Sequence, residues 1–318
     1  MEILETPADF RGKTHRYPGH QAGKNIEEAF DEFIRRQAPN LKTKWVYLPI
    51  FWQNNLFAQK RPKGGPFRAR PEVQAFLNRL NPNTRYFTVT VADEGMYEHV
   101  PPNVTIFGAG GTGSIPIPLL CTPHPCRIEV RNKLAFFMGN IETGGPVASD
   151  RPPSESSWDP NGAGARVRRR MRDVLANKPG FMITDGRGNS RKNLAQFRDE
   201  SYCHLYGLAP RGYGKTSYRL YEVMQMGCVP VYIYDQPWIP YTDVLDWNEF
   251  SIICPIENID ALPAVLESRT QEDWLKMRDV IRSAWNEFFT IEGCCHQILR
   301  YVMSQKYEPK YPVPSQPK

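Results

Sequence analysis

The stretch LAPRGYGKTSYRLYEVMQMGCVPV, residues 208–231, brings together residue types that can bind a phosphate group. Its glycines allow backbone N–H groups to come close to an anion, and Arg211 offers a planar pair of donors for phosphate oxygens. Thr216 and Ser217 follow where a helix is expected to begin, and the N-terminus of a helix attracts negative charge. The stretch therefore predicts an anion site between a strand and a helix.

Two familiar nucleotide-binding motifs are incomplete in this sequence. A Walker A loop would end at Gly214-Lys215-Thr216, but Ala209 replaces its first glycine and Pro210 removes an N–H donor. The run GAGGTG at 108–113 fits G-x-G-x-x-G, yet the alternating prolines of IPIP at 115–118 cannot open a helix after it. We expect a loop at a strand end in place of a dinucleotide site, a solvated Lys215, and a P-loop-like NTPase only as the lesser alternative.

The overall charge and composition narrow the class of partner. The 318 residues carry a formal net charge of +6, which suits an anionic ligand, and no dense basic stripe indicates nucleic acid. We interpret the arginine-rich run 166–172 as the solvated face of a helix. The sequence has no leader-like apolar region and no apolar run long enough for a membrane span, and its seven cysteines have no framework spacing. We expect a cytoplasmic or otherwise soluble protein, located in the Golgi lumen only if an anchor has been removed.

Strand and helix patterns alternate twice along the chain, separated by a segment rich in proline and glycine. Apolar runs that end at glycine or acidic residues predict buried strands, and apolar residues at helical spacing predict covering helices. This rhythm predicts parallel sheets, with a loop at 142–164. The expected strands are 45–51, 86–92, 104–107, 133–138, 181–184, 202–208, 229–234 and 250–254, and the expected helices are 25–36, 71–80, 165–176, 217–226, 259–266, 271–289 and 292–305.

Residues 201–247 resemble the C-terminal half of the exostosin-like glycosyltransferases. The blocks that carry the resemblance are PRGYG at 210–214, TSxRLxE at 216–222, GCVPV at 227–231 and WIPYTDVLDW at 238–247, and their mutual spacing also follows the family pattern. Weaker similarity extends upstream through 115–120, His124-Pro125 and 136–139, and touches 45–52 and the strand that ends at Asp93.

The resemblance implies the α/β GT-B architecture, with two Rossmann-like domains facing each other across a cleft. It implies an acceptor-binding domain at 1–131, a nucleotide-sugar-binding domain at 132–290, and a C-terminal helix and tail at 291–318 that cross back to the first domain. The implied activity is inverting transfer of a hexosyl or pentosyl group from a nucleotide sugar, commonly a UDP-sugar, to a hydroxyl of a glycan acceptor. A non-catalytic nucleotide- or sugar-binding relative of the same fold is the alternative.

The resemblance also assigns roles to residues of the quoted stretch. Arg211 is expected to contact the diphosphate, where charge grows as the glycosidic bond breaks, and to assist catalysis there. Glu222 is expected to accept hydrogen bonds from the ribose, or else to be an exposed ion-pair partner on its helix. Arg219 faces either the phosphates or a structural carboxylate, and the hydroxyls of Thr216 and Ser217 either cap the helix or bind phosphate. The expected donor-binding set is Gly139, Arg211, Gly212, Tyr213, Gly214, Thr216, Ser217, Arg219 and Glu222.

Inversion requires a base that removes the proton of the acceptor hydroxyl. In a GT-B enzyme this base lies in the N-terminal domain, at the carboxyl end of a strand. Asp93 follows the strand 86–92 and is the first candidate, with Glu94 as the second and a simple Asp-Glu-Gly turn as the structural alternative. The histidines at 20, 99 and 124 are further candidates without a clear strand end.

No D-x-D triplet and no histidine–cysteine cluster occurs in the sequence, so no metal-binding residues are assigned. We expect a metal-independent reaction whose partners are the nucleotide-sugar donor and the glycan acceptor, with no cofactor, nucleic acid or membrane span.

Overall fold

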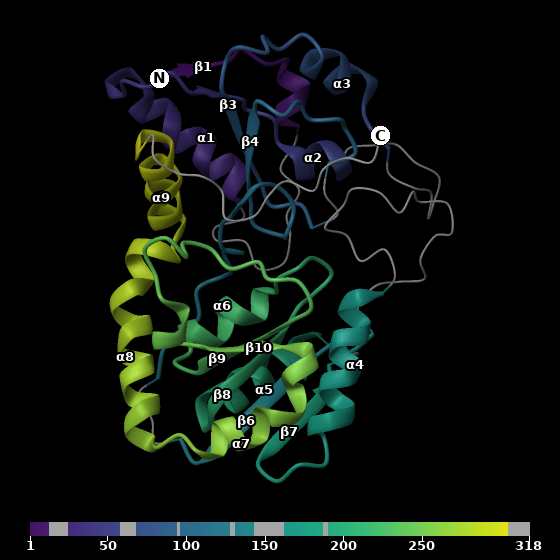
Figure 1. Ribbon diagram of the computed structural model, residues 1–318, viewed down its shortest axis with the longest axis vertical. Helices are drawn as coiled ribbons and strands as arrows, with labels where there is room; N and C mark the ends of the chain where they lie inside the picture. Colours follow the sequence, from purple (N-terminus) through teal and green to yellow (C-terminus); the bar gives the residue numbers. More distant parts are fainter. Residues whose placement is uncertain are drawn as a thin grey trace. The chain divides into compact units, whose positions relative to one another are not determined.

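The computed structural model describes residues 1–12, 25–57, 68–93, 96–127, 131–142, 162–186 and 190–304. These residues form two compact units, each built on its own five-stranded sheet (Figure 1). The first unit holds Met1–Leu120 and the described residues from Glu287 onward, and the second holds the described residues between Cys121 and Asn286. The division at Leu120 lies upstream of the predicted boundary at 131.

The sheet of the first unit is parallel throughout, in the order β1-β2-β3-β4-β5. Its long strands β3 and β4 are buried almost completely, as expected for a parallel sheet covered on both faces. The β-branched and aromatic residues of YFTVT and VTIFG favour this extended, buried conformation. The five strands are β1 (Glu2–Ile3), β2 (Val46–Tyr47), β3 (Tyr86–Thr90), β4 (Val104–Gly108) and β5 (Ile115–Pro116).

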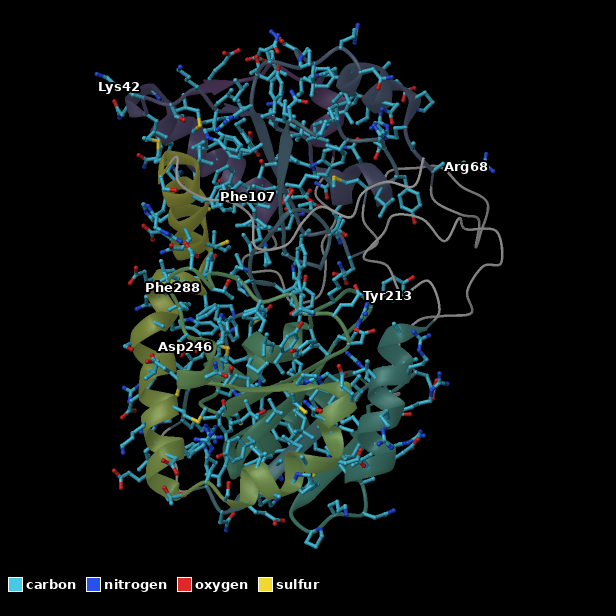
Figure 2. The ribbon with its side chains drawn as sticks, in the orientation of Figure 1. Lys42, Arg68, Phe107, Tyr213, Asp246 and Phe288 are labelled. Atoms are coloured by element: carbon cyan, nitrogen blue, oxygen red, sulfur yellow. The ribbon has the colours of Figure 1, made fainter. Side chains whose placement is uncertain are left out.

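Helices cover both faces of this sheet. Phe30 of α1 (Ile26–Gln37) packs edge-on against Phe87, with ring centroids 6.0 Å apart, and Tyr301 of α9 (Ile291–Ser304) packs against Phe107 at 5.1 Å (Figure 2 labels Phe107). Tyr86 alternates with Phe87 and faces the other way, toward Phe76. Phe76 belongs to α3 (Pro71–Leu77), which follows α2 (Trp52–Phe57).

The sheet of the second unit is also parallel, but its strand order is β10-β9-β8-β6-β7. The first strand of the unit, β6, therefore has neighbours on both sides, and the order of the chain reverses between β6 and β8. Ligands of doubly wound sheets bind at the carboxyl ends of the strands at such a reversal. The strands are β6 (Lys133–Gly139), β7 (Phe181–Asp185), β8 (His204–Pro210), β9 (Val229–Tyr234) and β10 (Ile252–Pro255).

Successive side chains of β6 point to opposite faces of the second sheet, and helices cover both faces. Phe136 points to the face covered by Phe197 of α5 and Val223 of α6, whereas Phe137 points to the opposite face, below Arg168 of α4. The prediction of an α/β fold with two Rossmann-like domains is thus confirmed for each unit taken by itself. The helices are α4 (Ala163–Leu175), α5 (Ser190–Cys203), α6 (Tyr218–Gln225), α7 (Leu262–Glu267) and α8 (Gln271–Phe288).

The long helices are amphipathic elements of these cores. The Trp274 indole of α8 is buried and donates to the carbonyl of Leu205, which fixes α8 on the second sheet. Within the described part of the chain, no helix combines the length and the apolar character that crossing a bilayer would require.

Candidate active site

The candidate donor site lies where the strand order of the second sheet reverses. Gly139 ends β6 and Pro210 ends β8, so the segments that follow them leave the sheet side by side. A β-carbon on Gly186, which follows β7, would lie only 3.1–3.4 Å from the backbone of Gly139, so this edge is closely packed. The β8–α6 turn, residues 211–217, joins the end of β8 to the start of α6 (Figure 2 labels Tyr213).

Arg211 is built into the turn that it was expected to serve. Its side chain is buried, and its Nε donates to the carbonyl of Gly214 at 3.0 Å while one terminal nitrogen donates to that of Tyr213. The other terminal nitrogen pairs with Asp235 at 2.7 Å. Arg211 therefore shapes the turn, and contact between its guanidinium and a phosphate remains a prediction.

Arg168 corrects the expectation that the arginine-rich run is a solvated face. On α4, Arg166, Arg169 and Arg170 are exposed, but Arg168 is only 7% exposed. Its guanidinium donates to the carbonyls of Arg211 at 2.9 Å and Asn140 at 2.6 Å, so it joins the segments that leave β8 and β6. Burial, together with the charges of Arg219 and Arg211, lowers the pKa of Arg168. Because a guanidinium stays charged at neutral pH, this arginine is held in an unfavourable electrostatic environment.

Arg219 and Glu222 form a pair one helical turn apart on α6. Their closest charged atoms are 3.5 Å apart, and the Arg219 guanidinium stacks on the ring of Phe197 with its carbon 3.7 Å from the centroid. The terminal nitrogen of Arg219 in this ion pair is buried and makes no hydrogen bond within the described chain. A β-carbon on Gly139 would lie 3.6 Å from the other terminal nitrogen, so Arg219 reaches the end of β6.

The two hydroxyl residues of the turn have different roles. Ser217 is the N-cap of α6 and accepts a hydrogen bond from the N–H of Arg219, which is the capping alternative of the prediction. Thr216 is 2% exposed, and its hydroxyl has no partner within the described chain. Its carbonyl accepts from the N–H of Gly212 at 2.8 Å, and this bond closes the turn. The Thr216 hydroxyl is thus a buried donor whose hydrogen bond is not made within the described chain.

The electrostatic balance of this region favours an anion. Three buried or largely buried guanidinium groups, those of Arg168, Arg211 and Arg219, lie around the turn and interact with one another. The carboxylates that pair with them are Asp235 and Glu222. Burying an incompletely compensated charge is costly, so binding of a negative group here would be favourable. A diphosphate supplies the charge and the acceptor oxygens that these donors require.

Lys215 also departs from its expected solvated position. Its ammonium group lies 5.2 Å from the centroid of the Trp238 ring, and burial, followed by the charge of Arg211, lowers the pKa of Lys215. Its carbonyl accepts a hydrogen bond from the Tyr232 hydroxyl, which in turn accepts from the N–H of Trp238. These bonds connect the turn to the segment that follows β9.

His124 lies beside the same cluster. Its backbone N–H donates to the side chain of Gln225 at 2.8 Å, and its Nδ1 accepts from Arg198 Nε at 3.4 Å. Burial lowers the pKa of His124, and the charge of Glu222, which opposes this shift, also acts on the ring. A ring whose Nδ1 accepts a hydrogen bond carries its proton on Nε2, so it offers a neutral N–H donor.

The base candidate Asp93 lies in the first unit, directly after β3. It packs against the GAGGTG loop that follows β4, since a β-carbon on Gly110 would collide with the Asp93 carboxylate. This loop leads into β5 and opens no helix, so the dinucleotide motif is absent as expected. The second candidate, Glu94, lies outside the described residues, and the role of Asp93 as the base remains a prediction.

The metal independence of the reaction also remains a prediction. Across the residues that the structure describes, no three histidine, cysteine or acidic side chains come together as metal ligands would. An ion held mainly by the diphosphate itself would need fewer protein ligands, so metal independence stays a prediction.

Sequence reasoning did not select Arg168, although a signal for it exists. Gly164, Arg168, Met171 and Leu175 are all buried and recur at the three- and four-residue spacing of one helix face. An arginine at such a position on an amphipathic helix points to the core side, where it needs polar partners or an anion.

Comparison with known proteins finds a family that is similar to about half of the chain, mainly to its second unit. The family model for the Exostosin GT47 domain matches residues 114–269. The matched segment includes β6 to β10, the whole predicted donor-binding set and Arg168, whereas Asp93 lies before it.

Two relatives and one solved structure illustrate what the chain is similar to. The chain is 31% identical over 144 residues, 45% of its length, to the Arabidopsis thaliana protein named "Probable glycosyltransferase", and 26% identical over 104 residues, 33% of its length, to exostosin-1 of Bos taurus. These alignments cover 23% and 14% of the two relatives, so the chain spans about a quarter or less of their length. A solved glycosyltransferase from Rickettsia africae is similar at a TM-score of 0.38 and 9% identity, over 88% of this chain and 82% of the other.

Proposed function

We propose that this chain, an exostosin-like glycosyltransferase by its match to the GT47 domain, transfers a sugar from a UDP-sugar to a hydroxyl group of a glycan acceptor with inversion at the anomeric carbon. The observation that supports this proposal most strongly is the cluster of buried guanidinium groups at the carboxyl ends of β6 and β8. The choice of a uridine nucleotide, and of inversion, follows the family resemblance.

In this proposal the donor diphosphate lies against the turn between β8 and α6. Arg168 and Arg219 neutralise the charge that develops on the leaving diphosphate, and the free hydroxyl of Thr216 donates to one of its oxygens. Glycine at 212 keeps the turn narrow, since a β-carbon there would lie 3.2 Å from the Thr216 carbonyl. Arg211 holds the turn in shape through Gly214 and Asp235.

Glu222 accepts hydrogen bonds from the ribose hydroxyls in this arrangement. Its carboxylate pairs with Arg219 at the edge of the phosphate-binding cluster, so a nucleoside that continues from the phosphates would meet it there. We propose the ring N–H of His124 as a further donor to the nucleoside, since its ring and Glu222 interact electrostatically and its Nδ1 accepts from Arg198.

Bond exchange in this proposal follows the order of an inverting displacement. The acceptor oxygen attacks the anomeric carbon as the bond from that carbon to the diphosphate oxygen breaks. The proton of the acceptor hydroxyl passes to Asp93, and the electron pair of the broken bond remains on the diphosphate. No step in this scheme requires covalent attachment of the sugar to the protein.

Two measurements on the purified chain test the proposal together. UDP should raise the melting temperature while ADP and GDP raise it less, and at least one UDP-sugar of a panel should release UDP slowly with water as the acceptor. A binding protein without a working base would show the thermal shift alone. Absence of both responses would contradict the proposed donor site.

A further inference from the structure

A buried carboxyl group lies at the carboxyl end of β3, the central strand of the first sheet, and the mechanism above does not use it. Glu27, in the first turn of α1, is 0% exposed. Its Oε1 accepts the N–H of Val91 at 3.0 Å, and both of its oxygens accept the N–H of Gln53 at 3.3 Å. Val91 directly follows β3, and Gln53 lies in the first turn of α2. One side chain of α1 thus holds the exit of β3 and the start of α2.

The contacts of Glu27 continue toward Asp93. The Thr90 hydroxyl also acts on the Glu27 carboxyl and lowers its pKa, and the hydroxyl oxygen accepts from the N–H of Ala92 at 3.1 Å. The carbonyl of Thr90 accepts from the N–H of Ala109 at 2.9 Å. Ala92 and Ala109 immediately precede Asp93 and Gly110, the two residues that pack against each other. Glu27 therefore holds the backbone two residues before Asp93, and Thr90, the neighbour of Val91, binds the backbone that precedes Gly110.

We propose that Glu27 is a positioning residue for the reaction, because its carboxyl group fixes the end of β3 from which Asp93 projects. This inference rests on the proposed role of Asp93 as the base. A buried carboxyl is an expensive way to satisfy two backbone N–H groups, since burial disfavours its charged form. Such a cost in folding free energy is expected where a strand end must be held to within a fraction of an ångström of one geometry.

The protonation state of Glu27 should make this positioning role visible as a dependence of turnover on pH. Burial raises the pKa of Glu27 to about 8, against the opposing effect of the hydrogen bonds from Val91, Gln53 and Thr90. Glu28 on the same helix and Tyr47 on β2 are the titratable groups that interact with it electrostatically. The carboxyl is therefore mostly protonated at pH 7, and above about pH 8 it becomes a buried anion, which burial disfavours.

Two substitutions at this position separate positioning from a general loss of stability. Glu27→Gln keeps an oxygen for the N–H groups of Val91 and Gln53 and cannot ionise, so its turnover at pH 7 should stay close to wild type. Glu27→Ala removes every bond and should lower turnover by roughly 10²-fold, the cost of a misplacement of about 1 Å. Asp31→Ala is the matched control, because Asp31 is also buried on α1 but pairs with Arg35 on its own helix.

The experiment measures UDP release from the most readily hydrolysed UDP-sugar between pH 6 and 9.5, with the dissociation constant of UDP measured in parallel. Wild type and Asp31→Ala should lose turnover above about pH 8, and Glu27→Gln should not. UDP affinity should be unchanged in all four proteins. Turnover of Glu27→Ala equal to wild type, the same alkaline loss in Glu27→Gln, or equal damage by Asp31→Ala would each overturn the proposal.

A second readout keeps the inference testable if no UDP-sugar is hydrolysed, an outcome that would count against the proposed function instead. Amide hydrogen exchange of the peptides covering 86–93 and 104–110 should become faster in Glu27→Ala and stay unchanged in Asp31→Ala. Exchange in these peptides that does not distinguish the two variants would refute the positioning role.

Discussion

Arg168 offers the sharpest test of the donor site, and the substitution is Arg168→Met. Methionine keeps much of the volume of the side chain but removes its charge, and with it the cation–π contact of the guanidinium with the Phe137 ring. If Arg168 contacts the diphosphate, the variant loses a charge-assisted hydrogen bond worth about 1.5–3 kcal/mol, which corresponds to roughly 10- to 150-fold weaker UDP binding.

The same substitution should have little effect on the stability of the free protein. The variant loses the bonds from Arg168 to the carbonyls of Arg211 and Asn140, but it also loses a buried charge that Arg219 and Arg211 repel. These effects oppose each other, so a melting temperature near that of wild type is expected.

Calorimetric titration with UDP measures the affinity, and Arg169→Met is the matched control. Arg169 lies next to Arg168 on α4, but it is exposed and pairs with Glu142 at 3.2 Å, so its loss should leave UDP binding unchanged. UDP affinity of Arg168→Met equal to that of wild type would refute the assignment. A large loss of stability in the free variant would show that Arg168 is structural.

Four further predictions concern the two units. Arg211→Ala should weaken UDP binding because it releases the turn and Asp235, and unchanged affinity by titration would remove it from the donor site. Asp93→Asn should reduce UDP release from a UDP-sugar by about 10²–10⁴-fold with UDP binding intact, whereas near-normal turnover would exclude it as the base. Turnover should survive EDTA, and complete loss restored by Mn²⁺ or Mg²⁺ would reveal a required metal. The free energy of unfolding of the wild-type protein, measured with denaturant, should fall by up to about 5 kcal/mol between pH 4.5 and 8, because folded Glu27 keeps a proton that the unfolded chain releases. An equally steep fall in Glu27→Gln would contradict the raised pKa of Glu27.

The sequence predicted most of the elements because their apolar patterns are strong. The strand VPVYIY occupies the predicted residues 229–234, and α8 begins at the predicted Gln271. The short elements β1, α2 and β5 were not predicted, and two longer segments also differ from the prediction for local reasons. The predicted strand 45–51 pairs only at Val46–Tyr47, because the chain turns into α2 at Trp52. The helix Ser190–Cys203 was not predicted, since few apolar residues mark its buried face.

The sequence predicted where the candidate donor site lies, but not which side chains pair with each other there. The turn at 211–217 lies at the strand ends, as its glycines and hydroxyl residues indicated. Local sequence could not show that Arg211 pairs with Asp235, because the two residues meet only when β8 and β9 align in the sheet. Nor could it show that Glu27 holds Val91, a contact between residues that are distant in sequence.

The measurement that tests the central claim most directly is a proton NMR time course of the chain with UDP-α-sugars and water as the acceptor. The account predicts growing UDP signals and a free sugar that first appears as the β-anomer, with neither change in the Asp93→Asn variant over the same period. A sugar released first as the α-anomer would contradict inversion. No UDP release by wild type from any donor that it binds would contradict the proposed glycosyltransferase activity.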